Sequence, residues 1–321
     1  MRDTFIRALS TLAETRPDLM LITADLGFGA LNDWILRFPR QFLNAGVAEQ
    51  NMTGLAAGMA LEGRTVFTYS LGGFPTVRCL EQIRNDVCYH HANVKIVTVG
   101  GGMSYGPVGA SHHATEDLAI MRSLPNMLVL SPGDLWETAE ATRALVNTSG
   151  PAYLRLDKSA AAPTHLPGES FHVGRIRVIR QGWDVTLAAT GGIVGEAVRA
   201  AELLAARGVT CRVLSVHTVK PLDHAALAAA ARETGGIVTM EEHSLDGGMG
   251  GAVAESLMDA GAIPGFFLRF GLRTFSSIVG SQSYLRKVYG LDAGAVVNAV
   301  LARLGLRGVT AGAEAEAACA F

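Results

Sequence analysis

Glu49 is the residue whose type and placement first suggest chemistry. It lies in the run GVAEQN (46–51), where an apolar segment ends and a small-residue helix carrying Gly54 and Gly58 is expected to begin. An acidic residue in a first helical turn has two interpretations. It favours the helix dipole and is a common helix-start signal, or it is a buried acid placed where a ligand meets the helix terminus. Glu49 alone leaves both open.

Other candidate residues are expected at the ends of parallel strands. Strands and helices alternate along the chain, which predicts parallel, doubly wound sheets whose ligands bind at the carboxyl ends of the strands. The positions expected at or just after such ends are Asp25, Glu49, Tyr69, Gly100 and Arg155. His112 follows in the glycine-rich loop 100–113, and there a catalytic role and a plain turn role are equally open.

The histidine pairs and the glycine-rich turn at 190–195 do not fit a metal site or a dinucleotide site. The pairs His90-His91 and His112-His113 are adjacent in sequence, so their side chains point apart, and no cysteine or carboxylate cluster joins them. We therefore expect no metal ligands in this chain. The run TGGIVG (190–195) lacks the full GxGxxG pattern and a following acidic residue, which argues against a dinucleotide site.

Composition restricts the class of protein. The chain has 321 residues, 49% of them hydrophobic and 17% charged, and a net charge of −2. Its length favours two domains, and its charge gives no footprint for nucleic acid or an anionic membrane. The four cysteines form no CxxC pair, and no apolar run is long enough to span a membrane. We expect a soluble, cytoplasmic protein.

The elements that would position these residues form two α/β units. Strands are expected at 19–23, before Glu49, and at 64–69, 94–99, 127–130 and 153–156, with helices between them. Residues 161–172 are aperiodic and proline-containing, which indicates a linker. The predicted fold is thus two doubly wound, mostly parallel-sheet domains: 1–160, the linker 161–172, 173–307, and a flexible tail at 308–321.

Five segments, in order, resemble the transketolase family of thiamine diphosphate enzymes. They are ADL (24–26), GVAEQNM (46–52), QIRN (82–85), GASHH (109–113) and MRSLPN (121–126). The resemblance runs from Arg2 to about Leu304 and implies a pyrimidine-binding domain followed by a transketolase C-terminal domain. It is closest to the short C-terminal subunits of split transketolases, and less close to deoxyxylulose-phosphate synthases and 2-oxoacid dehydrogenase beta subunits.

The resemblance implies a role for each candidate residue. Glu49 would share a proton with the pyrimidine N1′, which promotes the imino tautomer that activates the thiazolium. Asp25 and Leu26 would lie beside the thiazolium, and His112 at the reacting carbonyl. Leu71 takes the position of the aromatic that stacks on the pyrimidine, with Phe74 nearby. The implied substrate contacts are Arg2, Gly100, His112 and Arg155, the two arginines suiting a phosphate.

Two features depart from the family pattern. The GDG motif and following asparagine that hold the diphosphate and its Mg²⁺ or Ca²⁺ are missing, because Gly133-Asp134-Leu135 lacks the second glycine. The resemblance therefore implies a partner, an N-terminal transketolase subunit carrying that motif and the metal, in an α2β2 assembly. Gly29, Gly100 and Val108 also replace polar substrate contacts, so ordinary ketose phosphates are expected to be poor substrates.

Three functions remain open on this basis. The first is a two-component transketolase-like transferase that moves a two-carbon unit from a ketose or 2-oxoacid donor to an aldehyde acceptor. The second is a 2-oxoacid dehydrogenase beta subunit, or a deoxyxylulose-phosphate-synthase-like enzyme using pyruvate. The third is a catalytically inactive scaffold that binds a partner. Glu49, Asp25 and His112 argue against the scaffold, and Leu71 argues for it.

Overall fold

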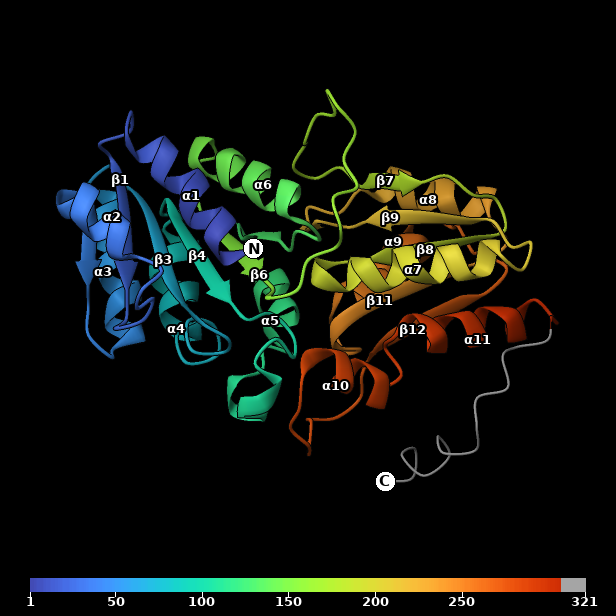
Figure 1. Cartoon of the computed structure of the whole chain (residues 1–321). Helices are drawn as coiled ribbons and strands as arrows, with labels where there is room; N and C mark the ends of the chain where they lie inside the picture. The colour runs from blue at the N-terminus through green and yellow to red at the C-terminus, as the bar shows by residue number, and fades with distance from the viewer. Residues whose placement is uncertain (307–321) are drawn as a thin grey trace.

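Two α/β lobes lie side by side in the computed structural model, which describes residues 1–306 (Figure 1). The N-terminus lies at the junction of the lobes, close to the end of β6 in the view shown. The predicted fold of two doubly wound, mostly parallel sheets is confirmed. The predicted tail, residues 308–321, lies outside the described residues. None of the helices in the described part is long and apolar enough to cross a membrane.

The first sheet has the strand order β10-β5-β6-β4-β3-β1-β2. Its strands are β1 (Leu19–Thr23), β2 (Phe42–Asn44), β3 (Thr65–Leu71), β4 (Val94–Val99), β5 (Leu128–Leu130), β6 (Ala152–Leu156) and β10 (Thr218–Lys220). All neighbours are parallel except β10, which pairs antiparallel with β5. Leu71 lies level with Val99, and Val99 with Leu156. The carboxyl ends of these strands therefore form one edge.

Alternate residues of the first sheet face two different helical layers. Leu21 packs in the cluster under α1 and α6, whereas Met20 and Ile22 pack with α3, as the period-2 geometry of a strand requires. The helical elements of this lobe are α1 (Arg2–Ala13), α2 (Asn32–Arg37), η1 (Pro39–Gln41), α3 (Glu49–Leu61), α4 (Leu80–Gln82), η2 (Ile83–Tyr89), η3 (Gly106–Val108), η4 (Ala110–His112), α5 (Asp117–Ser123) and α6 (Leu135–Asn147).

The second sheet has the order β12-β11-β8-β9-β7, with β7 antiparallel at one edge. Its strands are β7 (Arg177–Arg180), β8 (Val185–Ala189), β9 (Cys211–Ser215), β11 (Ile237–Ser244) and β12 (Phe267–Leu272). The surrounding helices are η5 (Gly191–Ile193), α7 (Val194–Ala205), α8 (His224–Glu233), α9 (Met249–Asp259), α10 (Gln282–Val288) and α11 (Ala293–Arg303). Helices α7 and α11 pack together on one face, and α8 and α9 contribute to a core that continues into the first lobe.

The two lobes share more than a linker. Residues 157–176 contain no helix or strand, but the segment is held in place, since His165 stacks on Trp136 with ring centroids 5.2 Å apart. Strand β10 belongs to the second half of the sequence, yet it extends the first sheet. Lys220 at its end donates to the carbonyls of Arg122 and Leu124. The first sheet therefore includes a strand from beyond the predicted linker.

Lys95 is a fully buried cation in β4, at the end of the sheet opposite the strand carboxyl termini. Its ammonium donates to the carbonyl of Thr148 at 2.7 Å and to that of Gly150. Both acceptors follow the last turn of α6, where carbonyls lack intrahelical partners. Burial lowers the pKa of Lys95 from 10.5 to about 7. This residue thus couples the packing of α6 to pH.

We predict that Lys95→Met changes the pH dependence of stability. Between about pH 7 and pH 10.5 the unfolded chain binds more protons at Lys95 than the folded chain, so the free energy of unfolding of the native chain rises with pH there. Removing the amine removes this rise, which should be on the order of 1–2 kcal/mol from neutral pH to about pH 9. Urea unfolding at both pH values measures it. Exposed Lys287→Met is the control, and an equal pH slope for native chain and Lys95→Met would refute the prediction.

Candidate active site

Glu49 begins α3 and its side chain is withdrawn from water. The strand β2 ends at Asn44, Gly46 turns with a φ of +73°, and the helix starts at Glu49. The Glu49 side chain is only 3% exposed. Its Oε2 accepts a hydrogen bond from Arg78 Nη1 at 2.6 Å. An acid that only starts a helix can remain exposed to solvent, and carboxylates are seldom buried. The burial of Glu49 therefore favours the interpretation in which it faces a ligand.

The amide side chain of Asn44 joins Asp25 to the turn that precedes α3. Asp25 follows β1 with a left-handed φ of +55°, and its backbone N–H donates to Asn44 Oδ1 at 2.9 Å. Asn44 Nδ2 donates to Asp25 Oδ1 at 3.0 Å, while Asn44 Oδ1 also accepts from the N–H of Gly46. Leu26 is tied to the end of β1 through Thr23 Oγ1. Asn44 therefore fixes the two turns that carry the predicted cofactor contacts.

His112 and Phe74 meet at the next strand end. Strand β3 ends at Leu71, and Phe74 follows with its ring edge-on to His112 at 5.4 Å between centroids. His112 Nδ1 lies 3.0 Å from Ser111 Oγ. Gly72 has a φ of +48°, and a Cβ there would lie 2.7 Å from the carbonyl oxygen of His112. Only glycine lets the loop bearing His112 approach this closely.

Arg78 links these groups and was not identified from the sequence. Its guanidinium contacts the Glu49 carboxylate and lies over the Phe74 ring at 4.9 Å. Contacts thus run from Glu49 through Arg78 and Phe74 to His112. The one available signal was that a buried carboxylate needs a cation. Which cation supplies it is decided by the turn after β3, 29 residues along the chain.

Gly100 is not an empty position. Its φ is +96°, and a Cβ built there would lie 2.1 Å from Cε2 of Tyr105. The Tyr105 ring thus fills the volume that a side chain at position 100 would need. The ammonium of Lys158 lies over this ring at 3.9 Å from its centroid. Tyr105 and the exposed Lys158 therefore border the strand edge where a substrate contact was expected at Gly100.

The two predicted phosphate-binding arginines have different surroundings. Arg2 begins α1, is 48% exposed and pairs with Asp3, so its guanidinium is available at the surface. Arg155 has a fully buried side chain. The expectation that Arg155 binds a substrate phosphate is corrected, because the second lobe packs over the end of β6 and encloses it. Tyr69, also expected at a strand end, is a core residue stacked with Phe5.

The Arg155 guanidinium instead joins the two lobes. Its Nε donates to Asp117 Oδ2 at 2.8 Å, and its Nη2 donates to the carbonyls of Ala114 and Glu242. Glu242 of β11 also accepts from the backbone N–H of Met103 at 3.0 Å. The loop that carries Tyr105 and His112 is therefore held from both lobes.

No group of three or more His, Cys, Asp or Glu side chains within residues 1–306 has the arrangement of a metal site. The carboxylates near the site have other partners: Glu49 binds Arg78, Asp25 binds Asn44, and Asp117 binds Arg155. The described residues therefore supply a buried acid, an aromatic ring, an imidazole and surface cations.

Two family models match the chain in sequence order. The model of the transketolase pyrimidine-binding domain matches residues 1–163, and that of the transketolase C-terminal domain matches residues 174–296. A solved structure described as a split-gene transketolase in an inactive beta4 tetramer superposes with a TM-score of 0.85. It is 38% identical, and the alignment covers 95% of this chain and 98% of that one.

Curated relatives are named as transketolase sections or subunits, or as a synthase. A putative transketolase C-terminal section from Methanocaldococcus jannaschii is 36% identical over 94% of this chain and 95% of its own length. The 6-deoxy-6-sulfo-D-fructose transketolase subunit SqwH of a Clostridium species is 36% identical over 93% of this chain and 92% of its own. The 1-deoxy-D-xylulose-5-phosphate synthase of Thermomicrobium roseum is also 36% identical, but this chain spans 49% of its length. Both family models match, and relatives named as transketolase sections or subunits align over more than nine-tenths of their own length. This chain is therefore a member of the transketolase family, with the extent of a C-terminal subunit.

Proposed function

We propose that this chain is the cofactor-activating subunit of a two-component transferase that moves a two-carbon unit between a ketose or 2-oxoacid donor and an aldehyde acceptor. The observation that carries the proposal is the Glu49 carboxylate, which is buried at the start of α3 on the carboxyl edge of a parallel sheet. Phe74 and His112 lie in contact along the same edge. This is the arrangement that a pyrimidine-binding subunit requires.

The residues present fit the pyrimidine half of thiamine diphosphate. Glu49 is buried and has Arg78 as its one ion-pair partner in the described part of the chain, so a carboxylate oxygen is left for a ring nitrogen. Glu49 would hold a proton at N1′, and Asp25 and Leu26 would border the thiazolium. Phe74 would supply the aromatic surface that Leu71 lacks. When bound, the cofactor supplies a nucleophilic carbon that makes and breaks carbon–carbon bonds next to a carbonyl.

The diphosphate half is assigned to a second polypeptide. The sequence holds no GDG motif with a following asparagine, and oxygen ligands for a divalent ion are what such a motif provides. We propose a partner N-terminal transketolase subunit that binds the diphosphate with Mg²⁺ or Ca²⁺, in an α2β2 assembly, in the cytoplasm. The inactive state named for the beta4 tetramer of a related split transketolase supports the need for a partner.

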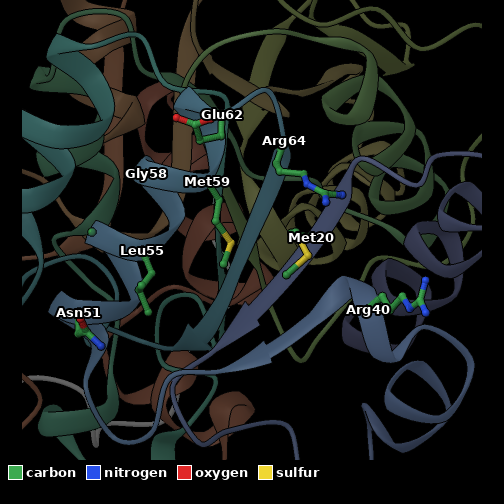
Figure 2. Close-up of a pocket in the computed structure, with 9 residues that line it drawn as sticks. Met20, Arg40, Asn51, Leu55, Gly58, Met59, Glu62 and Arg64 are labelled. Carbon is green, nitrogen blue, oxygen red and sulfur yellow. The ribbon is translucent and has the colours of Figure 1, made fainter.

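A groove beside α3 is the surface proposed for that partner. It has a volume of about 710 Å³ and lies between α3 and the edge of the first sheet. Its lining residues on α3 begin at Asn51, two residues after Glu49. Figure 2 shows Leu55 and Met59 of α3 together with Met20 of β1. Apart from the backbone of α3 itself and the adjacent residues, no atom lies within 4 Å of a Cβ built at Gly54 or Gly58. The small residues would let a partner helix approach closely, as small residues do at helix contacts.

We predict that Gly54→Gln and Gly58→Gln weaken assembly without harming the fold. Both positions are helical with open space around them, and glutamine is the better helix former by roughly 0.5–1 kcal/mol. The added side chains would obstruct the partner. Sedimentation of mixtures with the partner subunit, and thermal unfolding of the free chain, measure both effects. Gly294→Gln in α11 is the matched control. Native association by both α3 variants would remove this groove from the interface.

Reconstitution tests the proposed function. The purified chain should show no transferase activity and weak thiamine diphosphate binding in a calorimetric titration with Mg²⁺. Adding the GDG-bearing partner should produce both transferase activity and tight thiamine diphosphate binding. Sub-micromolar cofactor binding by the chain alone would exclude a shared site. A pair that turns over pyruvate but no ketose would favour the deoxyxylulose-phosphate-synthase-like alternative. A pair that binds cofactor without turnover would favour the scaffold.

In the reconstituted pair, Glu49→Ala should lower turnover by about 10²–10⁴-fold, the usual cost of losing a proton-transfer group. The fold should persist, because alanine is a good helix former. Steady-state kinetics and circular dichroism measure the two effects. Glu202→Ala, at an exposed position of α7 in the second lobe, is the control. Retention of more than about a third of the native rate, against a loss of this size, would reduce Glu49 to a helix-start residue.

The donor substrate that we propose is anionic, and it depends less than xylulose 5-phosphate does on hydrogen bonds between its hydroxyls and the protein. Arg2 and Lys158 provide exposed positive charge, while Gly29 and the half-exposed Val108 offer no side-chain hydrogen bond. Tyr105 occupies the space beside Gly100. A site that cannot hydrogen-bond a substrate hydroxyl cannot use it for selection. The sulfofructose named for one relative is an example of an unusual anionic ketose.

We predict that the reconstituted pair uses xylulose 5-phosphate with ribose 5-phosphate poorly, below about 10⁴ M⁻¹s⁻¹ in kcat/KM. Val108→Asp should raise that value, with a gain of about 1–3 kcal/mol at most from one restored polar contact. Gly100→His should not, because its Cβ would collide with Tyr105 and its backbone conformation disfavours a side chain. Improvement by Gly100→His, or native kcat/KM above that limit, would contradict this account of the substrate pocket.

A further inference from the structure

Arg78 contacts the Glu49 carboxylate, and the family resemblance gave Arg78 no role. Arg78 Nη1 lies 2.6 Å from Glu49 Oε2, with side-chain exposures of 49% and 3%. No other arginine, lysine or histidine nitrogen among residues 1–306 lies within 4.0 Å of this carboxylate. One oxygen of the acid is therefore engaged by a cation that reaches it from the solvent side.

The guanidinium is itself held in place. It lies over the Phe74 ring at 4.9 Å, a distance that allows cation–π attraction. Phe74 in turn packs edge-on against His112 at 5.4 Å. The planar guanidinium of arginine keeps its hydrogen-bond donors in fixed directions, unlike a lysine ammonium. Ring and guanidinium together limit the orientations that Arg78, and through it Glu49, can adopt.

The other neighbours of Glu49 do not restrain its carboxylate. Ala48, at the N-cap position, has no side-chain oxygen to offer the helix start. Thr53 Oγ1 donates to the backbone carbonyl of Glu49 and not to its carboxylate. Cys79 lies nearby, but burial raises the pKa of its thiol, so it stays neutral. Arg78 is therefore the side chain that orients the acid.

We propose that Arg78 is a positioning residue that holds Glu49 by Oε2 and leaves Oε1 for the pyrimidine ring of the cofactor. This inference rests on the proposed function, since it assigns Glu49 to the cofactor. A buried carboxylate without a partner is costly and would turn away or change its protonation. The pair thus keeps Glu49 in one orientation before the cofactor arrives. Because half of Arg78 is exposed, the pair forms without burying the guanidinium.

A double-mutant cycle in the reconstituted pair tests this role. The variants are Arg78→Met, Arg78→Lys, Glu49→Gln and the double variant Glu49→Gln/Arg78→Met. The measurements are the thiamine diphosphate Kd by calorimetry, kcat and KM separately, and the thermal midpoint of the free chain. Arg78→Met should weaken cofactor binding by about ten- to a hundred-fold, the size of one lost hydrogen bond to a charged group. It should lower kcat while KM for the substrates stays within about twofold, because the effect acts through the cofactor.

Two comparisons separate positioning from other roles. Arg78→Lys should recover part of the affinity, since it keeps the charge but loses the planar donor pair. In the Glu49→Gln background, Arg78→Met should change the Kd by less than about twofold, because the coupling between the two residues is already absent. Arg207→Met, at an exposed arginine of the second lobe, is the control and should match the native pair.

Three results would overturn the inference. An equal loss of affinity from Arg78→Met in both backgrounds would mean that Arg78 contacts the cofactor or substrate itself. An unchanged Kd and kcat in Arg78→Met would mean that the pair positions nothing. A lower thermal midpoint with native kinetics would show a structural role only. If Arg78→Met alone does not fold, the double variant, which removes both charges, still gives the comparison with Glu49→Gln. A native pair that binds no cofactor fails the proposed function, not this inference.

Discussion

The burial of one carboxylate, that of Glu49, is the constraint on which the site depends. An ionised acid enclosed by protein must have a cation or hydrogen-bond donors close by, and here Arg78 meets that need at 2.6 Å. Glu49 is placed by β2, the Gly46 turn and the start of α3, whereas Arg78 is placed by the turn after β3. The two strands are separated by β1 in the sheet. The ion pair therefore forms only when the first sheet is assembled in its native order.

A second set of buried charges keeps the two lobes in register. Arg155 binds Asp117 and two carbonyls, one from each lobe, and Arg286 of α10 binds Glu242. Burial raises the pKa of Asp157 to about 6, and Arg155 opposes that rise. These residues are too enclosed to meet a substrate. Their consequence for function is indirect, because Glu242 also fixes the loop that carries Tyr105 and His112.

In the proposed function this chain supplies the acid-bearing half of a shared site, and the structure already supports the residues assigned to it. Asn44, Gly72 and the second lobe position the predicted contacts. The side that would receive a partner is different in character. Along α3 the exposed residues from Gly54 to Leu61 are small or apolar, and the space beside Gly54 and Gly58 is open. This small and apolar stretch of α3 is the face that we propose a partner subunit covers.

The alternation of strands and helices determined the fold class, because parallel sheets follow from that pattern and from hydrophobic periodicity alone. The run around Glu49 and the order of the motifs likewise determined the family, and they predicted which acid serves the cofactor. Neither signal reaches beyond local order. The sequence did not reveal that β10 joins the first sheet, or that the second lobe buries Arg155, because both depend on how the lobes pack. It also missed Arg78 and the Tyr105 ring beside Gly100. Those contacts join residues that come together only through the conformations of loops. Neither strand–helix alternation nor hydrophobic periodicity predicts a loop conformation.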